Sequence, residues 1–196
     1  EGVEELKQAA SGKQGIILLA PHLSNWEIFG IYACQNIVST FMYQPPKLPA
    51  LDRLLQRTRS RGGMKLAPAD RKGVSLLLKA LQRGEMVGVL PDQVPNDEGG
   101  VFANFFGKQA LTMTLVSKLV ARSQARVFCG FVVRLPKSGG FKLTIREADK
   151  SIYDEDLITS VSGLNKSVEN CVLTAVEQYQ WEYKRFRRQS DGEKFY

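Results

Sequence analysis

This chain of 196 residues is poor in histidine and cysteine, and it lacks any long apolar run. Its single histidine, His22, excludes every site that needs two histidines. The three cysteines, Cys34, Cys129 and Cys171, are far apart and have no metal-ligand spacing, which predicts reduced thiols in a cytosolic compartment. No apolar segment is long enough to cross a bilayer, and no Gly-x-Ser-x-Gly motif supports a serine hydrolase of that type.

Charge of one sign is in excess, because 27 Lys and Arg against 20 Asp and Glu give a net charge of +7. A basic chain implies an anionic partner, and nucleic acid, anionic lipid and an acidic carrier protein all qualify. The length fits one domain with a substantial core, residues 1–196. Since the chain begins with Glu1 rather than Met, we expect it to be a fragment.

A short apolar run over residues 16–20 ends at Pro21, and His22 follows at once. A run of this length between Gly15 and Pro21 is typical of a strand buried on both faces. Residues 26–36 then have the apolar spacing of a helix packed on a sheet. His22 is therefore predicted in the turn after the carboxyl end of a strand, where open α/β sheets bind their ligands.

Glu27, five positions after His22, has two explanations. Ser24 and Glu27 fit a capping box, in which each side chain accepts a backbone N–H at the start of a helix. Alternatively, the Glu27 carboxylate orients the imidazole and leaves its other ring nitrogen as a general base. Five positions on one continuous helix would place the two side chains roughly 140° apart. The second explanation therefore requires the break between strand and helix that Pro21 and Ser24 predict.

Three further positions stand out downstream. Asp92 and Gln93 follow a second apolar strand, residues 86–90, and emerge at the same sheet edge as His22 if the two strands are parallel. Alone, Asp92 is equally well explained as a turn residue after proline. Arg59 flanks the apolar stripe of a predicted helix over 51–61, so it needs an acidic partner or an anionic ligand.

The remaining pattern predicts alternating strands and helices, then a change in the second half. Residues 94–108 read as a loop whose phenylalanines form a core plug or contact an acyl chain. Residues 126–135 and 141–147 predict a β-hairpin, because Ser138-Gly139-Gly140 separates them. Residues 160–188 predict a final helix, and the basic, aromatic end of this segment suits either the helix dipole or an anionic membrane surface.

The stretch from His22 to Glu27 resembles the His-x-x-x-x-Glu motif of the bacterial lipid A late acyltransferases, a branch of the glycerophospholipid acyltransferase superfamily. An arginine at the distance of Arg59 and the pair Asp92-Gln93 extend this resemblance over nearly the whole chain. It implies an α/β fold like that of glycerol-3-phosphate acyltransferase: a mixed, mostly parallel sheet flanked by helices, with an antiparallel hairpin in the C-terminal half. It also implies a catalytic dyad of His22 and Glu27 and a set of substrate-binding residues, Asn25, Arg59, Asp92 and Gln93.

The resemblance further implies acyl transfer from acyl carrier protein to a hydroxyl of a lipid A precursor, without metal or dissociable cofactor. It places the protein at the cytoplasmic face of the bacterial inner membrane, with an anionic membrane surface as partner, no nucleic acid, and a membrane helix upstream of this fragment. Two alternatives stay open. One is the same chemistry on a lysophospholipid, glycerol phosphate or another glycolipid. The other is a non-catalytic basic module that binds membrane or nucleic acid, although no nucleic-acid-binding motif accompanies the charge.

Overall fold

The computed structural model describes residues 1–35, 37–61, 63–193 and 195–196, without the side chains of Cys34 and Arg61. Its centre is a six-stranded sheet in the order β3-β2-β4-β1-β7-β8, in which β8 is antiparallel to β7 and the other neighbours are parallel. The strands are β1 (Ile16–Leu19), β2 (Ser39–Tyr43), β3 (Lys65–Pro68), β4 (Met86–Val89), β7 (Arg126–Arg134) and β8 (Phe141–Glu147). The predicted fold class, with its C-terminal hairpin, is confirmed.

β1 lies inside the sheet, and all four of its residues are buried. Because successive side chains of a strand point to opposite faces, β1 contributes to two cores. Ile17 and Leu19 pack with α4, α5 and α6, whereas Ile16 and Leu18 pack with α1 and α2. These helices are α1 (Val3–Ala10), α2 (Trp26–Cys34), α4 (Arg71–Gln82), α5 (Leu115–Ser123) and α6 (Leu157–Val172). The apolar run that precedes His22 is thus fixed from both sides.

The predicted loop over residues 94–108 is wrong in part. It contains β5 (Gly100–Phe105), which pairs antiparallel with β6 (Lys108–Met113) and packs against α6. Phe105 is 1% exposed, which confirms the core-plug interpretation for that side chain. No clear strand signal is present here, because Gly99-Gly100 and Asn104 interrupt the apolar pattern.

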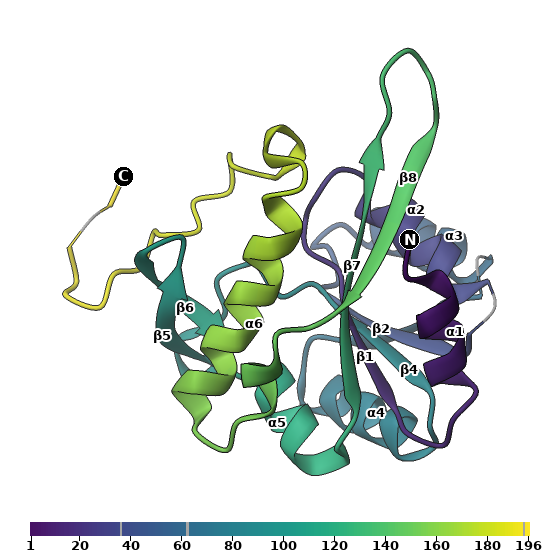
Figure 1. Ribbon diagram of the computed structural model, residues 1–196, viewed down its shortest axis with the longest axis horizontal. Coiled ribbons are helices and arrows are strands. Elements are labelled where there is room, and N and C mark those ends of the chain that lie inside the picture. The colour runs from purple at the N-terminus through teal and green to yellow at the C-terminus, as the bar shows by residue number, and fades with distance from the viewer. Residues whose placement is uncertain (36, 62, 194) are drawn as a thin grey trace.

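The predicted helix over residues 160–188 is wrong beyond Val172, where α6 ends. A 3₁₀ turn, η3 (Val176–Gln178), follows, and the chain then runs without regular structure past the β5–β6 hairpin (Figure 1). The reason is tertiary: buried Tyr179 forms an isolated antiparallel bridge with Leu23, beside His22. This contact turns the chain back toward the sheet edge and overrides the helical pattern.

The β7–β8 hairpin is confirmed at the predicted residues and projects beyond the rest of the sheet (Figure 1). Cys129 on β7 and Cys171 on α6 are buried thiols with their sulfur atoms 3.1 Å apart. The contact with Cys171 and burial raise the pKa of the Cys129 thiol, so it stays protonated. Among the described residues, no helix combines the length and the apolar character that a membrane span needs.

Candidate active site

The site lies at the carboxyl ends of two neighbouring parallel strands. β1 pairs with β4 in a register that sets Leu19 opposite Val89, so both strands end at the same sheet edge. The Ala20 N–H donates to the Val89 carbonyl over 2.9 Å, which holds the carboxyl ends of the two strands together. His22 follows one strand and Asp92 the other, as the sequence predicts for parallel strands.

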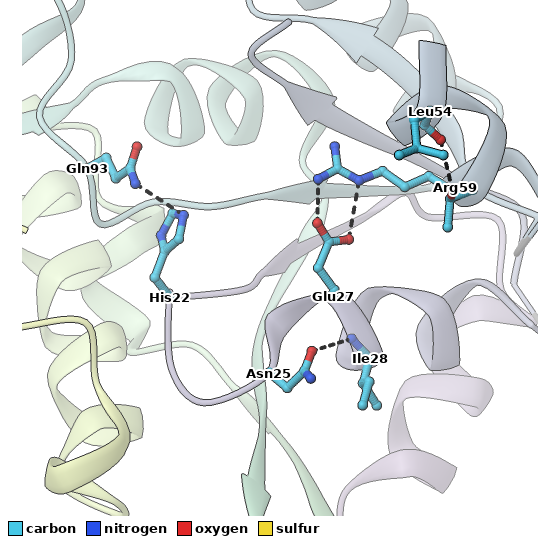
Figure 2. A network of polar contacts seen from close by, with 8 residues as sticks. His22, Asn25, Glu27, Ile28, Leu54, Arg59 and Gln93 are labelled. Atoms are coloured by element: carbon cyan, nitrogen blue, oxygen red, sulfur yellow. Dashed lines mark hydrogen bonds and ion pairs between the residues drawn. The ribbon is translucent and has the colours of Figure 1, made fainter. Parts of the chain in front are cut away.

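His22 is hydrogen-bonded twice to Asp92. Its Nδ1 lies 2.7 Å from Oδ1 of Asp92, and its backbone N–H donates to Oδ2 over 2.8 Å. The side chains are 12% and 2% exposed, respectively, so this contact is largely shielded from solvent. Because a carboxylate only accepts, the Nδ1 atom carries the proton, and because the Gln93 amide nitrogen only donates, the Nε2 atom beside it has a lone pair. Gln93 Nε2 lies 3.2 Å from that Nε2 atom and donates to it (Figure 2).

Glu27 points to the same side of the turn as His22 but binds a different partner (Figure 2). Its carboxylate accepts two hydrogen bonds from Arg59 on α3 (Pro49–Arg61): Nε to Oε2 over 3.2 Å and Nη2 to Oε1 over 2.5 Å. Arg59, 11% exposed, thus has the acidic partner that its position on the helix requires. Among the described residues, no hydrogen bond joins His22 to Glu27, so the orienting contact expected of Glu27 is made by Asp92 instead.

The start of α2 also differs from the predicted capping box. Asn25, not Ser24, is the N-cap, and its Oδ1 accepts the Ile28 N–H over 3.0 Å (Figure 2). Ser24 has a left-handed backbone with φ of 54°, which forms the sharp turn between His22 and the helix. Glu27 therefore has no capping role, and its carboxylate bonds to Arg59 instead. The predicted substrate contact of Asn25 stays a prediction, since its described contact is structural.

Trp26 lies between the His22–Asp92 pair and the Glu27–Arg59 pair. Its ring lies edge-on to the His22 imidazole with 5.6 Å between ring centroids, and the Arg59 guanidinium lies over it at 5.4 Å. Beside Glu27 and Arg59, a small crevice of about 20 Å³ lies between α2, β2 and β3. Its walls are mostly apolar and include Ala20, Gly30, Phe41, Met42, Met64, Leu66 and Leu90.

Sequence reasoning brought Asp92 and Gln93 to this edge but did not identify Asp92 as the partner of the imidazole. It missed Tyr179 and Tyr183, which reach the site from the C-terminal segment. Burial and the neighbouring Asp92 carboxylate raise the pKa of Tyr179 above its ordinary value. The Tyr183 hydroxyl accepts the Val94 N–H over 2.9 Å. No local pattern signals either contact, because both depend on where α6 ends.

The arrangement can perform acid–base chemistry. An imidazole with a buried carboxylate on one nitrogen and a lone pair on the other can take a proton from a hydroxyl and return it to a leaving group. Across the part of the chain that the structure describes, no three His, Cys, Asp or Glu side chains gather into a possible metal site.

Comparison with known proteins identifies the family. The family model of the bacterial lipid A biosynthesis acyltransferases matches residues 1–188. A lipid A biosynthesis acyltransferase of Haemophilus influenzae is 32% identical over 100% of the chain. A lipid A biosynthesis lauroyltransferase and a lipid A biosynthesis palmitoleoyltransferase of Escherichia coli are each 28% identical, over 97% and 98% of the chain. The chain spans 61% to 62% of the length of these relatives. It belongs to the bacterial lipid A biosynthesis acyltransferase family.

Proposed function

We propose that this chain is the catalytic domain of an acyltransferase that moves a fatty acyl chain from acyl carrier protein to a hydroxyl on a lipid A precursor. The acceptor that we propose is the hydroxyl of a 3-hydroxyacyl chain. The observation that carries the proposal is the His22–Asp92 pair, which leaves Nε2 as a base at the sheet edge. The family assignment over residues 1–188 supports the substrate class.

In the proposed reaction His22 acts as general base. As the acceptor oxygen attacks the thioester carbonyl carbon, its proton passes to Nε2, in the place where the Gln93 amide now donates. Asp92 holds Nδ1–H and stabilises the imidazolium that forms. The tetrahedral intermediate collapses, the carbon–sulfur bond breaks, and the leaving thiolate takes the proton from Nε2. The products are an ester and the free thiol of the carrier.

The Glu27–Arg59 pair supplies the positive end of the site in this proposal. Glu27 fixes the guanidinium by two hydrogen bonds, and the remaining N–H groups of Arg59 bond to no other described residue. These groups are proposed to bind the negative charge that develops on the thioester oxygen, or a phosphate of the lipid. This role differs from the predicted His–Glu dyad, because Glu27 acts through Arg59. The crevice beside the pair is mostly apolar, but its volume of about 20 Å³ is too small for a hydrocarbon chain, so an acyl chain would have to widen it.

Acyl carrier protein and an anionic membrane surface are the proposed partners, at the cytoplasmic face of the inner membrane. The net charge of +7 supports both. α3 exposes Leu51 and Leu54 together with Arg53 and Arg57, a composition that suits a lipid interface. The C-terminal basic segment is divided, since Arg187 and Arg188 are exposed but Arg185 is buried.

The test is an acyl-transfer assay with acyl carrier protein and coenzyme A thioesters as donors. Lipid A precursor, a lysophospholipid and glycerol phosphate serve as acceptors, and mass spectrometry locates the new ester. We expect transfer from the carrier protein to the lipid A precursor, reduced by roughly 1,000-fold or more in His22→Ala. Full activity of that variant would remove the proposed base. Transfer only to the lysophospholipid or glycerol phosphate would favour the alternative acceptors that share this chemistry.

A further inference from the structure

The C-terminal segment crosses both loops that carry the site. We define residues 178–188 as the C-terminal strap. It begins at Gln178, the last residue of η3, and from Tyr179 on it lies outside any helix or strand of the sheet, in contact with the His22 turn and with β6. The family assignment does not give this segment a role, and the predicted helix over residues 160–188 would have placed it elsewhere.

The strap first binds the turn that holds His22. The Ser24 N–H donates to the Gln178 carbonyl over 2.8 Å, and the Gln180 N–H donates to the His22 carbonyl over 3.2 Å. Between these bonds, Leu23 and Tyr179 form an antiparallel bridge. His22 and Ser24, on either side of Leu23, are thus held by backbone bonds to the strap, so the position of the imidazole depends on it.

The strap next binds the loop that holds Asp92 and Gln93. The Tyr183 hydroxyl accepts the N–H of Val94, the residue directly after Gln93, over 2.9 Å. Farther along, Arg188 pairs with Asp97 at 2.5 Å. The strap therefore bonds to the loop after β1 and to the loop after β4, although His22 and Asp92 are 70 residues apart in the chain.

A buried arginine, Arg185, fixes the strap to β6. Arg185 is 4% exposed, donates to the Leu111 carbonyl over 2.6 Å and to Thr112 Oγ1 over 2.8 Å, and lies over the Phe105 ring. Within the described part of the chain, it has no ion pair with a carboxylate. Burial lowers the pKa of Arg185, while Tyr179 and Asp92 act in the opposite direction. Its charge and that of Asp92 thus belong to one shielded region.

We propose that the C-terminal strap is part of the active centre, and that Tyr183 is a positioning residue that holds the Asp92–Val94 loop against His22 through its bond to the Val94 N–H. Without the hydroxyl, Val94 loses its acceptor and the loop shifts. Gln93 then no longer meets Nε2 in its present geometry, and Asp92 no longer holds Nδ1 as firmly. This inference rests on the proposed acyl transfer for its kinetic consequence but not for its structural one.

The chain offers a matched control. The Tyr153 hydroxyl accepts the Val127 N–H over 2.8 Å, the same kind of bond as that of Tyr183. Val127 pairs with Ile17 in the first half of β1, before the carboxyl end of the strand that leads to His22. Tyr183→Phe and Tyr153→Phe therefore remove the same group and leave the same backbone donor without its partner. A merely structural role predicts equal consequences for the site.

The experiment compares both variants with the unaltered chain. Because His22 is the only histidine, the ¹⁵N resonances of its ring report the site without overlap. We expect Tyr183→Phe to change these resonances and to lower kcat by about tenfold with little change in KM for the donor, as a small misplacement of the reacting groups does. Tyr153→Phe should change neither, at a comparable loss of thermal stability.

The strap proposal is overturned if the His22 resonances of Tyr183→Phe match those of Tyr153→Phe, or if kcat is unchanged. If the unaltered chain transfers no acyl group to any acceptor, the proposed function fails. The resonance comparison then still decides whether the strap positions His22.

Discussion

The two carboxylates around His22 differ in burial and in partner. Asp92 is 2% exposed and bonds to the imidazole, whereas Glu27 is 37% exposed and bonds to Arg59 at the rim. Asp92 is 70 residues away in the chain and Glu27 only five. Parallel pairing of β1 and β4 outweighs proximity in sequence, because it brings two strand exits to one point while the first turn of α2 directs Glu27 toward α3. The spacing of His22 and Glu27 in the sequence thus does not show which carboxylate bonds to the imidazole.

The difference in burial predicts a difference in consequence. In a shielded site, loss of one partner leaves the other without compensation, and the interaction that remains is not weakened by water. At the rim, solvent replaces part of a lost interaction. Changes at Asp92 should therefore affect the reaction more than changes at Glu27.

The largest effect is expected for Asp92→Asn. An amide at this position can donate to Nδ1 as well as accept from it, so the tautomer is no longer fixed and the imidazolium is no longer stabilised. We expect kcat to fall by roughly 1,000- to 10,000-fold, the scale found when the acid of a serine protease triad is replaced in this way. Steady-state kinetics with the lipid acceptor measure it. A loss smaller than that of Glu27→Gln would reverse the order of the two acids.

A smaller effect is expected for the Glu27–Arg59 pair. Glu27→Gln removes the charge that fixes the guanidinium, and the misplaced donors should lower kcat/KM by about tenfold to a hundredfold. If Glu27 acts only through Arg59, the double variant Glu27→Gln/Arg59→Gln loses no more than Arg59→Gln alone, because residues that act as one unit are not additive. Losses that multiply in the double variant would give Glu27 a separate role.

Tyr179, which is buried beside Asp92, also predicts a pH dependence of the stability. Burial and Asp92 raise the pKa of Tyr179 above the ordinary 10.0. The unfolded chain releases this proton near pH 10 while the folded chain retains it, so stability is present below that pH and falls as the pH rises above it. One proton corresponds to about 1.4 kcal/mol per pH unit. Denaturant titrations from pH 8 to 11 should show a shallower fall for Tyr179→Phe and an unchanged fall for the exposed control Tyr32→Phe. Equal slopes would contradict the assignment.

The smallest effect is expected for Asn25, the N-cap of α2, and it is an effect on the free energy of unfolding. Asn25→Ala removes the acceptor of the Ile28 N–H and should reduce the free energy of unfolding by about 1 kcal/mol. Ser24→Ala is the matched control, because Ser24 makes no cap bond, and should change it by only about 0.3 kcal/mol. Thermal or denaturant unfolding measures both. A larger loss from Ser24→Ala would restore the capping box predicted from the sequence.

Much of the fold follows from the sequence. The apolar runs before Pro21 and Pro91 predict buried strands, and their parallel pairing brings His22, Asp92 and Gln93 to one edge. The hairpin over residues 126–147 follows from its Gly-rich turn. These predictions succeed because local periodicity and turn chemistry determine them.

The failures share another cause. The position of Glu27 depends on whether Ser24 or Asn25 caps α2, and the end of α6 depends on the bridge of Tyr179 to Leu23. At the start of α2, Ser24 and Asn25 are nearly equivalent candidates for the cap. At the end of α6, the helical pattern continues in the sequence, and a contact distant in the chain overrides it. The hydrogen bond of Asp92 to His22 is likewise visible only once the register of β1 and β4 is known.

The most direct test of the central claim is the ¹⁵N spectrum of the single imidazole in the unaltered chain, in Asp92→Asn and in Glu27→Gln. The ring-nitrogen shifts report which nitrogen carries the proton and how firmly it is held. If Asp92 is the partner of His22, Asp92→Asn changes both shifts and Glu27→Gln leaves them as they are. A spectrum that responds to Glu27→Gln and not to Asp92→Asn would contradict the account.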